Sequence, residues 1–175
     1  VSWVPPYHDM GLIGGVLQPL YQGRQMVLMS PMDSLARPVR WLQAITKYSA
    51  TVSPAPNFAF ELCVRRIAPE QREGLDLSSW RVAFNGAEPI RPSTLERFED
   101  AFGPYGWRGQ TMLPCYGLAE STLIVSGHGP ELPAVVTPFD RDALGKGEAR
   151  PAAETETVER LVACRPEHLG EELRV

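Results

Sequence analysis

Residues 80–89 read WRVAFNGAEP, a short apolar run that stops at Asn, Gly and Pro. Residues 110–120 read QTMLPCYGLAE and follow the same plan. Short apolar runs that end in turn-forming residues are typical of buried strands, and Leu and Phe recur at helical spacing between these two runs. Strands that alternate with helices predict an α/β domain, with a largely parallel sheet flanked by helices.

Prolines mark the ends of the strand-like runs. The chain has 17 Pro in 175 residues, about twice the usual share of roughly 5%. They are spread along the chain rather than gathered in one tail, and Pro cannot donate to a strand ladder. We therefore predict that many of them terminate strands or make turns, namely Pro5, Pro6, Pro31, Pro54, Pro56, Pro89 and Pro114. Ligands of parallel α/β sheets bind beyond the carboxyl ends of the strands, so these exits are where a site is expected.

Helical stretches separate the runs. Residues 9–23 are apolar on most sides and predict a buried helix or helix pair. Apolar spacing predicts a helix over 34–48 with Pro38 in its first turn. Asn57 is predicted to cap a helix that runs to Ile67. Ser93 and Glu96 have the spacing of a capping box, and Gly103 is predicted to end that helix.

Composition excludes several classes of protein. The net charge is −4 and the pI about 5.4, without a basic stripe, so a nucleic-acid partner is not expected. No apolar run approaches the roughly 18 residues of a membrane span. The first ten residues have no basic region and no apolar signal core, so we expect no export signal. The three cysteines lie far apart, as in proteins with reduced thiols, so we expect a cytoplasmic protein. The absent initial Met predicts that the chain begins inside a longer gene product.

The texture changes after residue 125. Residues 1–125 form the predicted α/β part, and residues 126–163 are polar and rich in Gly, Pro and mixed charge. We interpret them as a long excursion from the core, with short strands at AVVTPF and RLVAC. Residues 164–175 would begin the following subdomain. His128 and His168 stand alone in polar segments and are expected at the surface.

Three strand exits carry residues with useful chemistry. Tyr116 could stack on a flat heterocycle, Gly117 could let the backbone approach a ligand, and Glu120 could bind Mg²⁺. A buried tyrosine and a helix-starting glutamate would explain the same residues. Residues 85–88 could meet a base edge or form an ordinary Asn-Gly turn. His8 beside Asp9 could be an oriented base or a structural histidine.

The combination of motifs is more specific than its parts. In order along the chain are WVPPYHDMGLIGG, RWLQAITKYSATVSPAPNFAFELCVRR, WRVAFNGAEPI and LPCYGLAESTLIVSG. Together they closely resemble the fatty acyl-AMP ligases of the adenylate-forming superfamily. The resemblance implies a piece of the large N-terminal domain of an enzyme that uses ATP and Mg²⁺ to convert a fatty acid to an acyl-adenylate. The acyl group then passes to the phosphopantetheine thiol of an acyl carrier protein.

The resemblance also implies residue roles. Tyr116 would stack on adenine within a cofactor-binding segment that includes Gly117, Leu118 and Ala119. Glu120 would coordinate Mg²⁺ and act in catalysis. The adenine pocket would be lined by Asn85, Gly86, Ala87 and Glu88. His8 would lie near the reacting carboxylate, and Gly14 and Gly15 beside the acyl tunnel. The superfamily often has Thr where Ala119 stands, so a hydroxyl contact to phosphate would be either missing or supplied by Ser121 or Thr122.

The family's phosphate loop and ribose-binding Asp are missing from these residues, as is the lid with its catalytic Lys, a role that neither Lys47 nor Lys146 matches. We therefore expect an inactive central fragment with cut surfaces that self-associate. The excursion matches an insertion that acyl-AMP ligases carry, which favours a carrier protein over CoA. A fragment of an acyl-CoA ligase, or a non-catalytic binding module derived from the ligase fold, are the alternatives.

Overall fold

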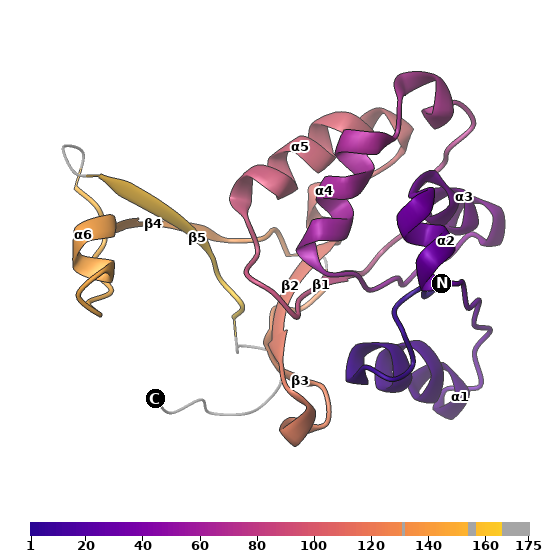
Figure 1. The fold of residues 1–175 in the computed structure, drawn as a ribbon, viewed down its shortest axis with the longest axis horizontal. Helices are drawn as coiled ribbons and strands as arrows, with labels where there is room; N and C mark the ends of the chain where they lie inside the picture. Colours follow the sequence, from indigo (N-terminus) through magenta and orange to yellow (C-terminus); the bar gives the residue numbers. More distant parts are fainter. Residues whose placement is uncertain (131, 154–156, 166–175) are drawn as a thin grey trace.

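The computed structural model describes residues 1–130, 132–153 and 157–165. Its helical elements are η1 (Met10–Leu17, a π-helix), α1 (Gln18–Tyr21), α2 (Pro31–Ala36), α3 (Val39–Tyr48), α4 (Asn57–Arg66), η2 (Pro69–Arg72), α5 (Pro92–Phe102), η3 (Gly103–Tyr105), η4 (Gly109–Thr111), η5 (Ala119–Ser121) and α6 (Arg141–Leu144). Its strands are β1 (Ala83–Asn85), β2 (Met112–Gly117), β3 (Ile124–Gly127), β4 (Val136–Asp140) and β5 (Val158–Val162). Figure 1 shows α4 and α5 over one side of β1 and β2, with η1 and α1 near the opposite end.

The central sheet confirms the α/β prediction. Its order is β1-β2-β3. β1 and β2 are parallel, and β2 and β3 are antiparallel. Residues 50–56 add parallel bridges from Val52 to Val82 and from Ala55 to Asn85, and Ser2 bridges Leu28 in the same sense. Pairing is thus parallel where helices flank the core, and antiparallel in the hairpin that β3 closes.

Aromatic side chains from α3, α4, α5 and the segment before β1 fill the core. The Trp41 ring meets Phe60 and Trp80 edge-on, with centroids 5.4 and 5.2 Å apart. Phe98 of α5 meets Phe60 of α4 at 5.2 Å, also edge-on. All four side chains are buried, and edge-to-face pairs add about 0.5–1.5 kcal/mol each beyond the burial of their area. The amphipathic helices are therefore held by this cluster, and β1 and β2 run through it.

The helix predictions need four corrections. The predicted helix over 34–48 is two helices, α2 and α3, because Arg37 before Pro38 leaves the helical region at φ −137° and ψ 79°. Pro38 is the residue before α3 rather than part of its first turn. Neither Asn57 nor Ser93 caps its helix, since both lie inside α4 and α5, and the N-cap residues are Pro56 and Arg91. The predicted helix end is confirmed, because α5 stops at Phe102 with Gly103 as its C-cap residue, and the chain continues into η3.

The predicted helix pair over 9–23 is present but not buried. η1 and α1 follow one another without a break. Large apolar side chains on their outer side are exposed, among them Leu17, Leu20 and Tyr21. An all-round apolar sequence predicts burial on every side, whereas the described residues cover η1 and α1 on one side only.

Two proline predictions also change. Pro114 lies inside β2, opposite Asn85, and is buried. Pro31 starts α2 as its first residue, where the missing N–H costs nothing. Proline therefore marks boundaries at some exits, but β2 continues past Pro114 to carry Tyr116.

Most of the polar excursion folds as a separate hairpin of β4, α6 and β5, apart from the core in Figure 1, whereas its first residues, Ser126 and Gly127, belong to β3 of the central sheet. β4 and β5 pair antiparallel over five residue pairs, with α6 between them. The buried Asp140 carboxylate receives a hydrogen bond from Arg150, and this bond lowers the pKa of Asp140. Arg160 of β5 reaches Glu96 of α5 at 2.8 Å and so ties the hairpin to the core. His168 and residues 166–175 of the predicted following subdomain lie outside the described residues.

No helix in the described part of the chain is both long and apolar enough to cross a bilayer.

Candidate functional site

The exits of β1 and β2 meet side by side. Parallel pairing sets Asn85 opposite Pro114, so the residues that follow each strand leave the sheet at the same edge. Gly86 presses against Cys115 so closely that a Cβ on Gly86 would lie 2.8 Å from the Cys115 carbonyl oxygen. The structure thus brings the predicted segment 85–88 next to the predicted segment 116–120.

A tight hairpin follows β2. The ladder with β3 shifts register between Tyr116 and Gly117, as a bulge does. A Cβ on Gly117 would lie 1.8 Å from the Leu123 carbonyl oxygen, so only glycine fits. Thr122 has a φ of 71°, which is uncommon for a β-branched residue. This backbone turns the chain back within a few residues and leaves the Tyr116 ring 56% exposed.

The predicted segments differ in what their side chains do. Asn85 is fully buried and donates from Nδ2 to the Met112 sulfur at 3.5 Å, while its Oδ1 has no partner in the described part of the chain. Ala87 has a φ of 68°, a strained angle for a residue with a Cβ. Glu88 accepts a hydrogen bond from the Phe58 N–H at 2.5 Å. Asn85 and Glu88 therefore hold this loop in place, with Gly86 buried and Ala87 exposed between them.

The third exit reaches the same region through η1. The Gly14 position faces the Leu123 side chain, 3.5 Å from where a Cβ would be, so η1 lies against the β2–β3 hairpin. Gly11 presses on the Pro5 carbonyl, which fixes the turn that carries His8. These two contacts bring the first exit of the chain to the hairpin.

His8 is a half-exposed side chain with a charged neighbour. Its Nδ1 lies 2.6 Å from an Asp9 carboxylate oxygen and also 3.1 Å from the Met10 N–H. The first contact requires a proton on Nδ1 and the second requires a lone pair, so the two exclude one another. Both use Nδ1, which leaves Nε2 as the nitrogen available to a ligand. Asp9 orients the ring because the chain turns here rather than extending as a strand.

Glu120 is exposed in the short turn η5. Across the described residues, no cluster of three or more His, Cys, Asp or Glu side chains is placed to hold a metal ion. A lone exposed carboxylate fits Mg²⁺ only in the manner of nucleotide enzymes, where phosphate oxygens and water complete the shell. A single carboxylate of this kind is compatible with a metal that arrives with a nucleotide.

Sequence reasoning missed the burial of His128. Its side chain was predicted at the surface, but only 5% of it is exposed, and Nδ1 lies 2.8 Å from the Gly129 carbonyl oxygen. The residue directly follows β3, which packs on β2, so sheet pairing buries it. Polar neighbours in the sequence gave no signal of this long-range contact.

The thiols near the site are poor nucleophiles. Burial, with a smaller contribution from Cys164, raises the pKa of Cys115 to about 12. The Cys115 thiol donates weakly to the Asn85 carbonyl at 3.6 Å. Cys115 therefore serves packing under Gly86 rather than covalent chemistry.

Two hollows lie away from these strand exits. One of about 530 Å³ is lined by Arg37, Arg40 and Arg66, where α2, α3 and α4 meet, together with Gln43. A second of similar volume lies between α5 and the start of the excursion, at Glu96. None of the predicted site residues lines either hollow.

Comparison with known proteins places this surface in a family context. A family model described as AMP-binding enzyme matches residues 1–158. The medium-chain-fatty-acid–[acyl-carrier-protein] ligase JamA of Moorena producens is 48% identical over 170 residues, covering 94% of this chain and 28% of that protein. A 4-hydroxyphenylalkanoate adenylyltransferase of Mycobacterium tuberculosis is 44% identical over 152 residues, covering 87% of this chain and 25% of that protein.

Solved structures agree. A fatty acyl-adenylate ligase from L. pneumophila, in complex with acyl adenylate and pyrophosphate, superposes with a TM-score of 0.90 at 47% identity, covering 94% of this chain and 29% of that one. The resemblance inferred from the motifs is thereby confirmed, as is the adenylate-forming α/β fold. The chain spans between 25% and 29% of the length of these relatives.

Proposed function

The chain belongs to the AMP-binding enzyme family, and on that premise we propose that it is the adenine-side part of a fatty acyl-AMP ligase. The whole enzyme would convert a fatty acid and ATP to acyl-adenylate and pyrophosphate, then transfer the acyl group to an acyl carrier protein. The relatives named as an acyl-carrier-protein ligase and as an acyl-adenylate ligase support this substrate class.

The observation that carries the proposal is the meeting of two strand exits. Gly86 touches Cys115, so the Gly86–Ala87 backbone and the exposed Tyr116 ring share one edge of the sheet. A flat aromatic face beside the exposed Ala87 suits adenine, because stacking would hold its plane and backbone atoms would meet its edge. Residues 117–119 continue this surface toward Glu120.

The remaining residues have roles in charge and position. Glu120 would hold Mg²⁺ together with the phosphate oxygens, and the metal would neutralise charge that develops on the phosphate. His8 would hold the acyl and phosphate groups through Nε2 while Asp9 fixes the ring. A hydroxyl contact to phosphate, where the superfamily often has Thr at position 119, would come from Ser121 or Thr122. Such preorganised groups act together on transition-state charge.

The test is pyrophosphate–ATP exchange by the complete gene product that contains residues 1–175. Exchange should depend on added fatty acid, and Tyr116→Ala should weaken the apparent affinity for ATP. The acid panel should include medium-chain and long-chain fatty acids and a 4-hydroxyphenylalkanoate, because relatives of each kind are similar to this chain. Absence of exchange with every acid would refute the proposal and favour a non-catalytic binding module.

The excursion would direct the second step. Residues 126–163 correspond to the insertion of acyl-AMP ligases, and Arg160 fastens its hairpin to Glu96 of α5. Deleting the part of this segment that follows β3, residues 128–163, from the complete enzyme should allow CoA to accept the acyl group. If the undeleted enzyme already uses CoA as well as a carrier protein, it is an acyl-CoA ligase instead.

The isolated 175-residue chain should neither catalyse exchange nor remain monomeric. It keeps one carboxylate for phosphoryl chemistry, and neither of its lysines matches the family's catalytic lysine. Tyr7, Leu20 and Tyr21 are exposed on the outer side of η1 and α1 and the turn before them, and exposed apolar clusters drive association. Light scattering at high concentration checks this, and a clean monomer would contradict it.

The three free thiols fit a protein that acts in the reducing cytoplasm.

A further inference from the structure

Three contacts join the loop after β1 to the start of α4. Ala55 bridges Asn85 in parallel, the Arg91 N–H donates to the Asn57 side-chain oxygen at 3.3 Å, and Glu88 accepts from the Phe58 N–H at 2.5 Å. The first two contacts flank the exposed turn. Glu88 is the contact within it, one residue after the strained Ala87.

The Glu88 carboxylate supplies what α4 lacks. The first turn of a helix has N–H groups with no partner inside the helix, and negative charge is favourable there. Pro56 precedes α4 and has no side-chain group to accept from them. Glu88 comes from a distant part of the chain and takes this place, so the bond links two segments rather than finishing one helix.

The two linked segments are not equally secure. α4 is anchored by Ala59, Phe60 and Cys63, all fully or almost fully buried. Residues 87–89 are exposed. Loss of the Glu88 bond would therefore free the loop and leave the helix in place. Ala87 would then be able to leave its unfavourable φ of 68°, which the bond helps to maintain.

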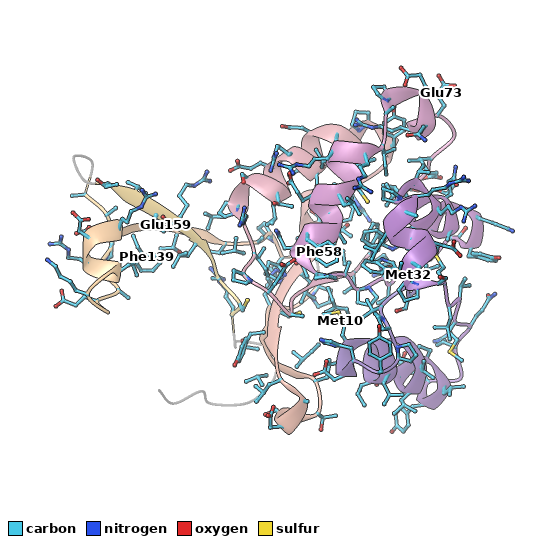
Figure 2. All side chains as sticks on the ribbon, viewed as in Figure 1. Met10, Met32, Phe58, Glu73, Phe139 and Glu159 are labelled. Atoms are coloured by element: carbon cyan, nitrogen blue, oxygen red, sulfur yellow. The ribbon has the colours of Figure 1, made fainter. Side chains whose placement is uncertain are left out.

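The start of α4 also contacts the segment that leads to His8. The Phe58 and Trp3 rings meet edge-on with centroids 6.3 Å apart, and Figure 2 shows Phe58 at the end of α4 nearest β1 and β2. The start of α4 thus contacts both the loop at 85–88 and the segment that leads to His8. The Glu88 hydrogen bond holds the loop in a fixed position relative to α4.

We propose that Glu88 is a positioning residue, which holds the Gly86–Ala87 backbone in its ligand-ready conformation by binding the first turn of α4. This rests on the proposed function, since the ligand of that backbone is the adenine of ATP. Glu88 itself does not need to touch the nucleotide. Its substitution should therefore change the use of ATP more than the use of fatty acid.

The experiment measures pyrophosphate–ATP exchange by the complete gene product, with Glu88→Ala, Glu88→Gln and Glu73→Ala. Glu73 is an exposed control near the opposite end of α4 (Figure 2). Glu88→Ala should raise the KM for ATP at least about fivefold, since the hydrogen bond from the Phe58 N–H to a charged acceptor is lost. The KM for fatty acid should change less than twofold. Glu88→Gln should return the KM for ATP to within about threefold of the wild type, because an amide oxygen still accepts from Phe58.

The outcomes separate the two proposals. An inactive wild-type enzyme would overturn the ligase assignment and the role of Glu88 with it. An active wild type whose KM for ATP is unchanged in Glu88→Ala would overturn the role of Glu88 alone. So would a loss of melting temperature without a change in KM, or a Glu88→Gln enzyme as impaired as Glu88→Ala. Wild-type behaviour of Glu73→Ala completes the expected result.

Discussion

Replacing Gly117 with Ala should be among the most damaging single-methyl changes in the chain. The added Cβ would lie 1.8 Å from the Leu123 carbonyl oxygen and 3.2 Å from the Ile124 Cα. Carbon and oxygen approach one another to about 3.3 Å at closest in proteins, so one partner must move by about 1.5 Å. Neither is the end of a flexible side chain: both atoms belong to the backbone of the β2–β3 hairpin.

The cost follows from what must give way. Overpacking a close-packed site costs about 1–3 kcal/mol, and a backbone obstacle places this change at the upper end, at about 3 kcal/mol. Urea unfolding followed by tryptophan fluorescence measures it, since Trp3, Trp41, Trp80 and Trp107 are all buried. The same variant should lose AMP binding in calorimetry, because the bulge that presents Tyr116 would be displaced.

Gly103→Ala is the matched control. Its Cβ would meet nothing within 4 Å, and its φ of −52° suits any residue. Removing glycine there should stabilise the fold by up to about 1 kcal/mol, through the unfolded state. If the free energies of unfolding of Gly117→Ala and Gly103→Ala lie within about 0.5 kcal/mol of each other, the hairpin is looser than the structure has it, and the reasoning from that contact is wrong.

Three further predictions test other parts of the molecule. Tyr116→Ala should weaken AMP binding by about 1–3 kcal/mol in calorimetry while Tyr116→Phe keeps most of it, because stacking needs the ring and not the hydroxyl. Hydrogen bonding to Arg150 lowers the pKa of Asp140 below its ordinary value of 3.8, so its stabilising effect is complete above that pH and is lost as the pH falls through the lowered pKa. The stability of the β4–β5 hairpin should therefore fall less steeply with decreasing pH in Asp140→Asn than in the wild type. The same pH dependence in both proteins would contradict this. Burial raises the pKa of all three thiols, but Cys164 is the least buried, so iodoacetamide should label it first and reach Cys63 and Cys115 only on unfolding.

The local sequence was sufficient for the two strands that carry the site. β1 and β2 lie within the runs at 80–89 and 110–120, since compact apolar runs bounded by turn residues have few other ways to be buried. The apolar stretches VSWVPPYH (1–8), RQMVLMSP (24–31) and ATVSPAP (50–56) form only isolated bridges, at Ser2, Leu28, Val52 and Ala55. Strand length depends on the neighbour available for pairing, and a run of side chains does not contain that information.

The helix ends show how tertiary contacts override local preference. Asn57 has the residue type of a cap, yet its amide oxygen accepts from the Arg91 N–H and its amide nitrogen lies 3.4 Å from the Thr94 hydroxyl. A buried amide must be satisfied by its neighbours, and here those neighbours come from the α5 segment. The break at Arg37, by contrast, was open to prediction, because a residue before proline disfavours the helical region.

The position of Pro114 bears on how Tyr116 would work. A proline that ended β2 would have left Tyr116 in a loop, where its ring would have more conformational freedom. Instead β2 runs on through Cys115, which pairs with Gly127, and Tyr116, which pairs with Ser126. The Tyr116 backbone is thus held by a strand on its β3 side, while its ring stays exposed. A platform held in this way loses little freedom when a base stacks on it, and such preorganisation is what turns a modest stacking energy into affinity. Shifting the β2–β3 register should accordingly weaken AMP binding even when Tyr116 itself is untouched.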